Sequence, residues 1–226
     1  MIEIFPTAVP ADIEELAERA AFVRKFSNLF HIDADDGILT PIVCWPYTAK
    51  GEFGTVDLST ANGLEVEVHL MVHDPREIGR AFARAGARAV FGHVETFRDV
   101  EDARETLNSW KAAGAREAGF AVLFDTPLET LDPFIPLCDF LCFMSSPRIG
   151  AQGAQFDPRV IERIRATKKK YPTLQLEVDI GVSEKTIAEL ARAGVTRFAA
   201  GSSIAKAADP KIAYENLKTI AENALE

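Results

Sequence analysis

Eight short strand-forming runs, each followed by a longer helical run, predict that this chain of 226 residues folds as a (β/α)8 barrel. Two further observations favour this fold. Helical runs repeatedly begin at Asp-Pro or Thr-Pro and end at Ala-Gly directly before the next strand, and polar residues gather where strands end. An open doubly wound sheet is the alternative, which we disfavour because no glycine-rich turn follows the first strand. We expect a single barrel domain over residues 1–226.

The expected strands are short runs rich in apolar and β-branched residues. The third is the clearest, because apolar and polar residues alternate from Leu64 to Leu70. Such alternation places one set of side chains on each face of a strand. The eight strands are expected at residues 2–9, 29–34, 64–72, 87–94, 120–124, 140–144, 174–180 and 195–200.

The expected helices are recognised by their ends as well as by an apolar stripe. Asp-Pro pairs, such as those at residues 74–75 and 157–158, supply an N-cap carboxylate followed by a proline that suits the first helical turn. Gly86, Gly114 and Gly194 stand where a left-handed C-cap is needed. The helices are expected at residues 10–21, 74–86, 100–113, 126–134, 157–170, 183–194 and 209–226, and the stretch 37–63 is expected to be a long loop with a short helix near 56–61.

The bulk composition excludes several classes of protein. With 47% hydrophobic residues and a net charge of −9, the chain can bury a sizeable core but has no basic cluster large enough for nucleic acid or an anionic membrane. Its three cysteines lack paired spacing and do not form a disulfide framework. We find neither a signal peptide nor an apolar run of membrane-spanning length, so we expect a reduced, cytoplasmic protein. A small anionic substrate remains compatible with this charge.

Four polar side chains fall at the ends of expected strands with inward-pointing parity. They are His31 and Asp33 on the second strand, His69 on the third and Asp179 on the seventh. Because the active site of a barrel lies at the carboxyl ends of its strands, we expect these groups to converge there. Two imidazoles and two carboxylates suit a divalent transition metal such as Zn²⁺, Fe²⁺, Mn²⁺ or Co²⁺. The simpler alternative is that His69 forms a hydrogen bond in the barrel mouth and Asp179 pairs with a cation.

Glycines after the last three strands form a second candidate site. Gly150, Gly153, Gly181 and Gly201 lie in loops where barrels commonly bind phosphate through backbone N–H groups and a short extra helix. Ser202 and the three residues after it could form that helix. The alternative is that the glycines serve as turns, and it stays open for Gly150 and Gly153 in particular.

Several segments together match a known family. Residues 31–37 read HIDADDG and are followed by Pro41, residues 68–72 read VHLMV and are followed by Pro75, residues 176–182 read LEVDIGV, residues 200–204 read AGSSI, and residues 93–95 read HVE. No single segment is specific. In combination they resemble the ribulose-phosphate 3-epimerase family, from Ile4 almost to the end of the chain.

The resemblance implies a TIM barrel of the ribulose-phosphate-binding type that inverts C3 of a ketopentose 5-phosphate, converting D-ribulose 5-phosphate to D-xylulose 5-phosphate. His31, Asp33, His69 and Asp179 match the family's ligands for one divalent metal ion, and Zn, Fe, Mn and Co stay open as its identity. Asp33 and Asp179 also match the two acid/base residues, one on each face of the sugar. The resemblance further implies a small-molecule sugar phosphate as partner and a homo-oligomer as the assembled form.

The resemblance extends to residues around the substrate. His69, Met71 and Met144 match residues that line the family's pocket, although ordinary core packing is the alternative for the two methionines. Thr7 stands where the family has a serine on the substrate side. These four side chains are therefore implied to lie beside the substrate.

Four departures from the family pattern concern the substrate side of the site. Asp35 replaces a methionine of the first motif and would repel an anionic intermediate unless its side chain points away. The phosphate loop at residues 146–155 is longer, less rich in glycine and contains Arg148, Ile180 replaces a glycine, and residues 124–127 lack the usual Asn-Pro turn. Two alternatives follow: a paralogue that acts on a different sugar or sugar phosphate, and a catalytically idle barrel that binds a ligand.

Overall fold

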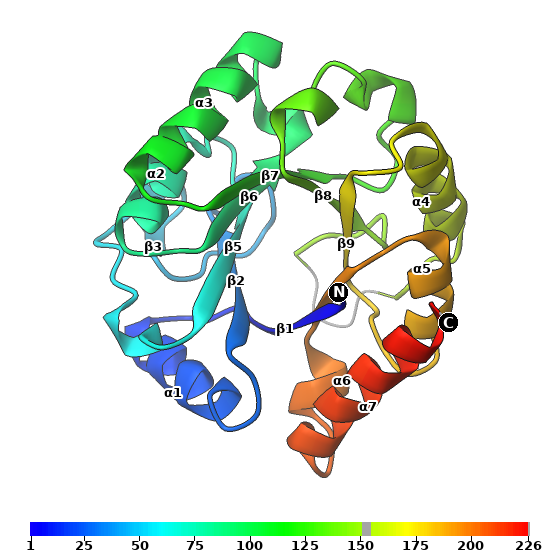
Figure 1. Ribbon diagram of the computed structural model, residues 1–226. Coiled ribbons are helices and arrows are strands. Elements are labelled where there is room, and N and C mark those ends of the chain that lie inside the picture. Colours follow the sequence, from blue (N-terminus) through cyan, green and yellow to red (C-terminus); the bar gives the residue numbers. More distant parts are fainter. Residues whose placement is uncertain (151–154, 226) are drawn as a thin grey trace.

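The computed structural model describes residues 1–150 and 155–225, and within them the chain forms a closed barrel. Figure 1 looks along the barrel axis, with the strands at the centre and the helices around them. The strand order is β1-β10-β9-β8-β7-β6-β5-β2, neighbouring strands are parallel, and β1 pairs with β2 to close the ring. The prediction of a (β/α)8 barrel is confirmed.

The barrel strands follow one another along the chain and are joined by helices and loops. The strands are β1 (Glu3–Ala8), β2 (Leu29–Asp35), β5 (Glu65–Met71), β6 (Ala89–His93), β7 (Glu117–Val122), β8 (Phe140–Met144), β9 (Gln175–Asp179) and β10 (Arg197–Ala200). The helices are α1 (Ile13–Val23), α2 (Arg76–Arg84), α3 (Val100–Ala113), α4 (Arg159–Lys170), α5 (Ile187–Ala193), α6 (Ser202–Ala205) and α7 (Pro210–Asn223). Short 3-10 helices are η1 (Ser59–Ala61), η2 (Val94–Thr96), η3 (Leu128–Leu131) and η4 (Ile135–Leu137).

Helices α1, α3 and α7 begin at an aspartate whose carboxylate accepts backbone N–H groups of the first turn, namely Asp12, Asp99 and Asp209. For α2 and α4 the predicted aspartate N-cap is wrong. There Pro75 and Pro158 take the cap position themselves, with backbone angles that are already helical. The aspartate before each proline instead accepts the N–H of the first helical residue, at 3.2 Å before α2 and 3.0 Å before α4.

Other boundaries also differ from the prediction. β7 begins and ends earlier than expected, because its first residues pair with β6 and the N–H of Leu123 leaves the ladder to donate to the Glu95 carboxylate (3.0 Å). The helix expected over residues 126–134 is replaced by η3 and η4. The long loop contains η1 near its end and an unpredicted hairpin of β3 (Tyr47–Ala49) and β4 (Glu52–Phe53).

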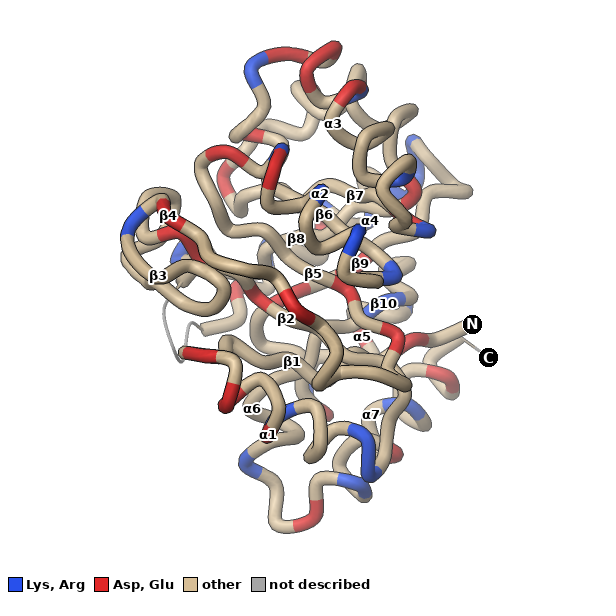
Figure 2. The backbone as a smooth tube through the Cα atoms, turned by 90° about the vertical axis from the view of Figure 1, so that its left-hand side faces the viewer, with Lys and Arg blue, Asp and Glu red and all other residues tan. Residues whose placement is uncertain are grey.

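Charged side chains of both signs are interspersed around the barrel. In the view of Figure 2, Lys and Arg segments lie among Asp and Glu segments along the outer helices and loops. The face in this view therefore has mixed charge. Among the residues that the structure describes, no helix is long and apolar enough to cross a membrane.

The interior of the barrel contains a layer of buried charge. Such interiors are usually filled by branched apolar residues. Here Glu67, Glu177 and Arg197 point inward and are at most 1% exposed. The guanidinium of Arg197 also lies over the ring of Phe140, 3.9 Å from its centroid. We call Glu67, Glu177 and Arg197 the polar floor, because the residues at the carboxyl ends of the strands rest on it.

Candidate active site and metal centre

The four predicted polar side chains meet at the carboxyl-terminal half of the barrel. His31 and Asp33 alternate along β2, and His69 on β5 lies beside Asp33 in the register of these strands. Asp179 is the last residue of β9. One possible ligand atom from each residue lies within 4.8 Å of the others. β2 continues one residue further than expected, to Asp35, and His31 is its third residue and does not end it.

One carboxylate oxygen joins the two imidazoles. Asp33 Oδ1 lies 3.2 Å from His31 Nε2 and 3.1 Å from His69 Nδ1. The second carboxylate approaches the same atom of His69, with Asp179 Oδ2 3.8 Å from His69 Nδ1. Both histidines are fully buried, and the side chain of Asp179 is 13% exposed. The four groups therefore face one another where water has little access. We call them the metal-ligand cluster.

The donor atoms of this cluster fit a divalent metal ion. His31 Nδ1 lies 2.8 Å from Glu67 Oε1, so this nitrogen holds the ring hydrogen and Nε2 presents a lone pair. That lone pair faces the lone pairs of Asp33, an arrangement that requires a positive species between them. A metal cation meets this requirement, and imidazole with carboxylate suits Zn²⁺, Fe²⁺, Mn²⁺ or Co²⁺. In the metal-free protein a proton can take this place: burial lowers the pKa of His31, but the Asp33 and Glu67 carboxylates raise it well above its usual value.

The two carboxylates of the cluster have opposite electrostatic environments. Burial favours the neutral form of Asp33, but the neighbouring His31 and His69 hold the pKa of that carboxyl well below its usual range. Burial and the charge of Asp33 together raise the pKa of Asp179. The ionised form is thus favoured for Asp33 and the protonated form for Asp179. A general base and a general acid that act as a pair need these two different protonation states.

The polar floor orients His31 from the opposite side. Arg197 donates to Glu67, to Glu177 Oε2 at 3.0 Å and to Glu117 Oε2 at 2.9 Å. Its charge compensates the Glu67 carboxylate that accepts the hydrogen of His31. This function was not predicted from the sequence. The available signal was the presence of charged residues at inward positions of strands that are otherwise apolar.

His69 is held by a different set of neighbours. Its ring stacks on Phe91, with 4.6 Å between centroids and 5° between planes. Its Nε2 lies 3.0 Å from Nε2 of His93, which is fully buried. Burial lowers the pKa of His93, which keeps that ring neutral. From the sequence, His93 was recognised only as part of a family motif, and no role was predicted for it.

A cavity of about 260 Å³ opens beside the two carboxylates. Its lining includes Asp33, Asp179, Met71, Met144 and Gly150. Both methionines are buried and add an apolar wall. The structure therefore brings two predicted acid/base residues, two predicted pocket methionines and one predicted loop glycine to a single cavity.

Comparison with known proteins agrees with this arrangement. A family model described as "Ribulose-phosphate 3 epimerase family" matches residues 3–205. This chain belongs to the ribulose-phosphate 3-epimerase family. Its curated relatives in that family have similar lengths, so the match extends over nearly the whole of each protein.

Two relatives and two solved structures illustrate the range of similarity. The cytoplasmic isoform of ribulose-phosphate 3-epimerase from Oryza sativa subsp. japonica is 33% identical over 213 residues, covering 92% of this chain and 89% of the relative. The Mycobacterium tuberculosis ribulose-phosphate 3-epimerase is 34% identical over 221 residues, covering 95% and 91%. The structure of 3-hexulose-6-phosphate synthase from Salmonella typhimurium aligns with a TM-score of 0.70 at 16% identity, covering 99% of this chain and 100% of that one. KGPDC from Streptococcus mutans aligns with a TM-score of 0.72 at 12% identity, covering 100% of each chain. At these identities the structural likeness shows the barrel fold alone.

Asp35, the charged replacement in the first family motif, lines the same cavity as Asp33 and Asp179 and contacts the loop that follows β2. Its Oδ1 accepts a hydrogen bond from the hydroxyl of Thr40, and its Oδ2 lies 3.7 Å from the Cys44 sulfur. Burial and the negative charge of Asp33 raise the pKa of Asp35 to about 7. Near neutral pH this side chain therefore has less negative charge than an ordinary aspartate, which reduces the repulsion expected for an anionic intermediate.

The glycines proposed for phosphate binding are also needed for close contacts between loops. Gly150 has a φ of 65°, and an added Cβ would lie 2.5 Å from Thr40 Cβ. Gly181 has a φ of 70°, and an added Cβ would lie 2.6 Å from Phe156 Cβ. Both positions thus have a structural reason for glycine, and phosphate binding by them stays a prediction. Gly153 lies outside the described residues.

Ile180 has a backbone conformation that glycine adopts readily. Its φ of 74° lies in the left-handed region, where a β-branched residue is rare. The conformation is held from both sides, because its N–H donates to Asp179 Oδ1 at 2.6 Å and its carbonyl accepts from the Ser145 hydroxyl. The isoleucine side chain lines the cavity beside the carboxylates. This position therefore adds apolar bulk to the rim.

Thr7, Gly201 and Ser202 lie together, but apart from that cavity. Helix α6 begins at Ser202, which confirms the short extra helix predicted there. Gly201 packs so closely on Thr7 that an added Cβ would lie 2.7 Å from Thr7 Oγ1. Thr7 and Gly201 line a small recess that they share with Arg19. In the described part of the chain, the cavity beside the carboxylates does not include these residues.

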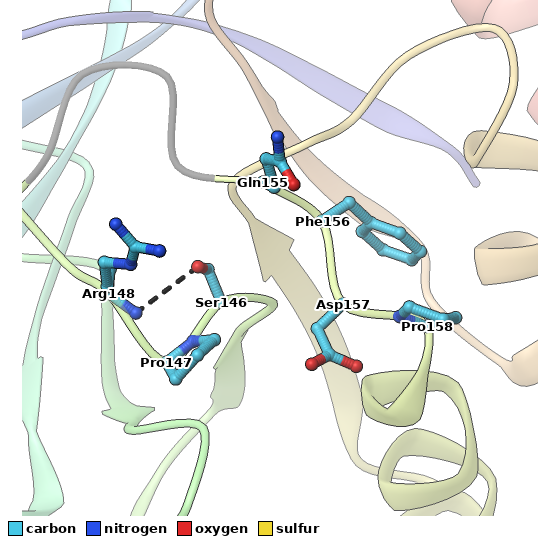
Figure 3. Close-up of a pocket in the computed structure, with 7 residues that line it drawn as sticks. All are labelled: Ser146, Pro147, Arg148, Gln155, Phe156, Asp157 and Pro158. Atoms are coloured by element: carbon cyan, nitrogen blue, oxygen red, sulfur yellow. Dashed lines mark hydrogen bonds between the residues drawn. The ribbon is translucent and has the colours of Figure 1, made fainter.

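A second cavity, of about 440 Å³, lies in the loop after β8 (Figure 3). Its lining comes from two stretches, residues 146–148 and 155–158. The N–H of Arg148 donates to Ser146 Oγ at 3.3 Å, and the Arg148 guanidinium and Gln155 project from different stretches in this view. The loop that departs most from the family pattern thus adds a cation near the rim of the barrel.

Proposed function

We propose that this chain is a metal-dependent epimerase that interconverts D-ribulose 5-phosphate and D-xylulose 5-phosphate. The observation that carries the proposal is the cluster of two histidines and two carboxylates, in a member of the ribulose-phosphate 3-epimerase family. Inversion at C3 requires one group that removes a proton from one face and another that supplies a proton to the opposite face. Asp33 and Asp179 meet this requirement.

His31, Asp33, His69 and Asp179 would hold one divalent metal ion, with Zn, Fe, Mn and Co as the identities that these ligands allow. When bound, the metal supplies Lewis-acid stabilisation of the negative charge that develops on the substrate oxygens as the C3 proton leaves. The buried neighbours of the two histidines hold the rings in place before substrate binds. This fixed arrangement lowers the reorganisation needed during turnover.

Asp33 and Asp179 move the protons in this proposal. In one direction the ionised Asp33 accepts the C3 proton, and the protonated Asp179 delivers its proton to the other face of the same carbon. Turnover exchanges their protonation states, so the same pair serves the reverse reaction. The apolar wall of Met71 and Met144 keeps water away from the carbon while it lacks a proton.

For the phosphate group of the substrate we propose the loops at the rim of the barrel. Backbone N–H groups in such loops bind anions without requiring a basic side chain. The guanidinium of Arg148 adds a positive charge to the loop after β8. The residues proposed for this part are Gly150, Gly153, Gly181, Gly201 and Ser202, while Thr7 on β1 is proposed to lie on the substrate side.

We further propose that the chain acts as one domain in a homo-oligomer in the cytoplasm, with a small sugar phosphate as its partner. The family resemblance supports the oligomer. The net charge of −9 supports the expectation that neither nucleic acid nor an anionic membrane is bound.

Deuterium incorporation tests the proposed reaction. Metal-loaded protein incubated with D-ribulose 5-phosphate in D₂O is expected to yield D-xylulose 5-phosphate with deuterium at C3, which NMR detects. Metal content is measured on the same sample. If the protein holds metal but forms neither C3 deuterium nor xylulose 5-phosphate, this substrate is excluded.

A different sugar or sugar phosphate is the second candidate substrate, and the changes at Ile180 and Arg148 favour it. A panel of sugars and sugar phosphates, assayed by the same exchange of hydrogen for deuterium, separates the two candidates. If phosphorylated pentuloses alone turn over, the second candidate is excluded. A catalytically idle barrel would fail the entire panel, and tightly held stoichiometric metal would count against it.

A further inference from the structure

His93 lies against the metal-ligand cluster without belonging to it. It is the last residue of β6, and its Nε2 is 3.0 Å from Nε2 of His69. Both rings are fully buried. A direct contact between two imidazole nitrogens in such surroundings requires that one donates a hydrogen and the other accepts it.

The position of the His69 ring is set by two neighbouring residues. Phe91 stacks on its face, and the β5–β6 register places Phe91 directly beside His69. This contact fixes the plane of the ring. The contact with His93 fixes the direction of Nε2 within that plane. Together they direct Nδ1 toward Asp33, 3.1 Å away, and Asp179, 3.8 Å away.

Counting the ring hydrogens determines what each nitrogen can do. A neutral imidazole has one N–H, so His69 can offer Nδ1 to a metal when its hydrogen is on Nε2. In that state His93 Nε2 is the acceptor, and the hydrogen of His93 is on Nδ1. This atom lies 3.6 Å from Glu95 Oε2, and it has no closer hydrogen-bond partner among the described residues. The N–H of Leu123 and the hydroxyl of Thr126 hold Glu95 in place.

The opposite arrangement would not present a metal ligand. If His93 Nε2 donated its hydrogen, the hydrogen of His69 would be on Nδ1 and would point at Asp33. We therefore propose that His93 is a positioning residue: it accepts the Nε2 hydrogen of His69 and so presents His69 Nδ1 to the metal. This inference rests on the metal centre proposed above.

Three variants test this role. His93→Phe keeps a ring of similar size but removes the acceptor, and His93→Gln keeps an acceptor oxygen. His73→Gln alters an exposed histidine outside the cluster and serves as control. Each metal-free protein is titrated with Co²⁺ in competition with a chelator, its visible absorption spectrum is recorded, and its thermal unfolding is measured without metal.

His93→Phe is expected to weaken Co²⁺ binding by roughly 10- to 100-fold and to change the absorption spectrum of the bound ion. His93→Gln is expected to recover most of the affinity, and His73→Gln should match the wild type. Unchanged affinity and spectrum in His93→Phe would overturn the role of His93 while leaving the metal centre intact. A wild-type protein that binds no Co²⁺ would instead refute the metal centre, and the inference with it.

A measurement on the wild type keeps the proposal testable if His93→Phe does not fold. In zinc-loaded protein with ¹⁵N-labelled histidine, the ring nitrogen shifts should show hydrogen on Nε2 of His69 and metal on its Nδ1. Metal bound to Nε2 of His69 would overturn the inference.

Discussion

The site has two regions, which meet between Asp179 and Ile180. Its base consists of the metal-ligand cluster and the polar floor, and its rim consists of the loops beyond the strand ends. The two regions are built differently. Asp179 ends β9 and belongs to the metal-ligand cluster, whereas Ile180 starts a loop in the left-handed region. Both cluster histidines lie on paired strands and have a second buried partner, Glu67 or His93. The rim instead depends on close contacts of single glycines with a neighbouring loop.

This difference indicates how the family can vary. The base is tied to the strand register, which one substitution does not shift, so the barrel itself holds the metal-ligand cluster together. Loops can change length and composition without disturbing that chemistry. We therefore expect substitutions in the base to alter turnover, metal affinity or folding, and substitutions at the rim to alter substrate affinity.

Asp179→Asn is expected to have the largest effect on turnover. An amide cannot deliver a proton, so the rate of epimerisation should fall by roughly 10²- to 10⁴-fold at saturating metal. The measurement is C3 deuterium exchange, with metal content determined on the same sample. Asp57→Asn, at an exposed position far along the loop after β2, should leave the rate unchanged. Near wild-type turnover in Asp179→Asn would remove this residue from the proton pathway.

Arg197→Met tests whether the stability of the protein depends on the buried positive charge of the polar floor. The variant leaves Glu67 and Glu177 without their cation, so the free energy of unfolding should fall by about 3–5 kcal/mol in a denaturant titration. Arg116→Met is the matched control, because Arg116 is 63% exposed and pairs with Glu65 at the surface. Its loss should be about 0–1 kcal/mol. Equal losses in the two variants would mean that the polar floor contributes no more than a surface pair.

Asp35→Asn should change how stability depends on pH. Because the pKa of Asp35 is raised to about 7, the folded protein keeps a proton that the unfolded chain releases near pH 4. The wild type therefore loses stability as pH rises from about 4 to about 7, and the asparagine variant lacks this loss. Denaturant unfolding at about pH 5 and about pH 8 should show the variant gaining relative to the wild type at the higher pH. A difference independent of pH would contradict the raised pKa.

Ile180→Gly should have the smallest effect and should act on the rim alone. Glycine adopts a φ of 74° without the strain of about 1–3 kcal/mol that a β-branched residue stores there. It also removes bulk from the cavity. We expect KM for D-ribulose 5-phosphate to fall several-fold with kcat little changed, measured by steady-state kinetics against Ile180→Val as control. A fall in kcat at unchanged KM would show that Ile180 affects the proton-transfer residues and not substrate affinity at the rim.

The fold and the metal-ligand cluster could be predicted because their signals are local. Alternation within one strand sets which side chains face inward, and this parity brought His31, Asp33 and His69 to the same side. The expected barrel topology then predicted that Asp179, on a strand distant in the sequence, lies close to these three residues. The end of β7 could not be predicted in this way, because it depends on a side chain, Glu95, that comes from the preceding strand connection.

The supporting residues escaped prediction for a similar reason. Arg197 and His93 act through partners on other strands, and which residues meet depends on register and tilt across the barrel. The contact of Gly150 with Thr40 joins two loops that are far apart in the sequence. A charged side chain or an imidazole at an inward position of a strand indicates that the side chain has a buried partner. The sequence does not identify which residue that partner is.

The polar floor also has a consequence for the order in which this protein can assemble. Arg197 lies on β10, the last of the eight barrel strands along the chain, while the carboxylates with which it pairs lie on β5, β7 and β9. Until β10 enters the ring, Glu67 and Glu177 lack the guanidinium of Arg197, which makes their burial less favourable. We therefore expect closure of the barrel and orientation of His31 to be coupled, and fragments that lack β10 to bind metal more weakly than the whole chain.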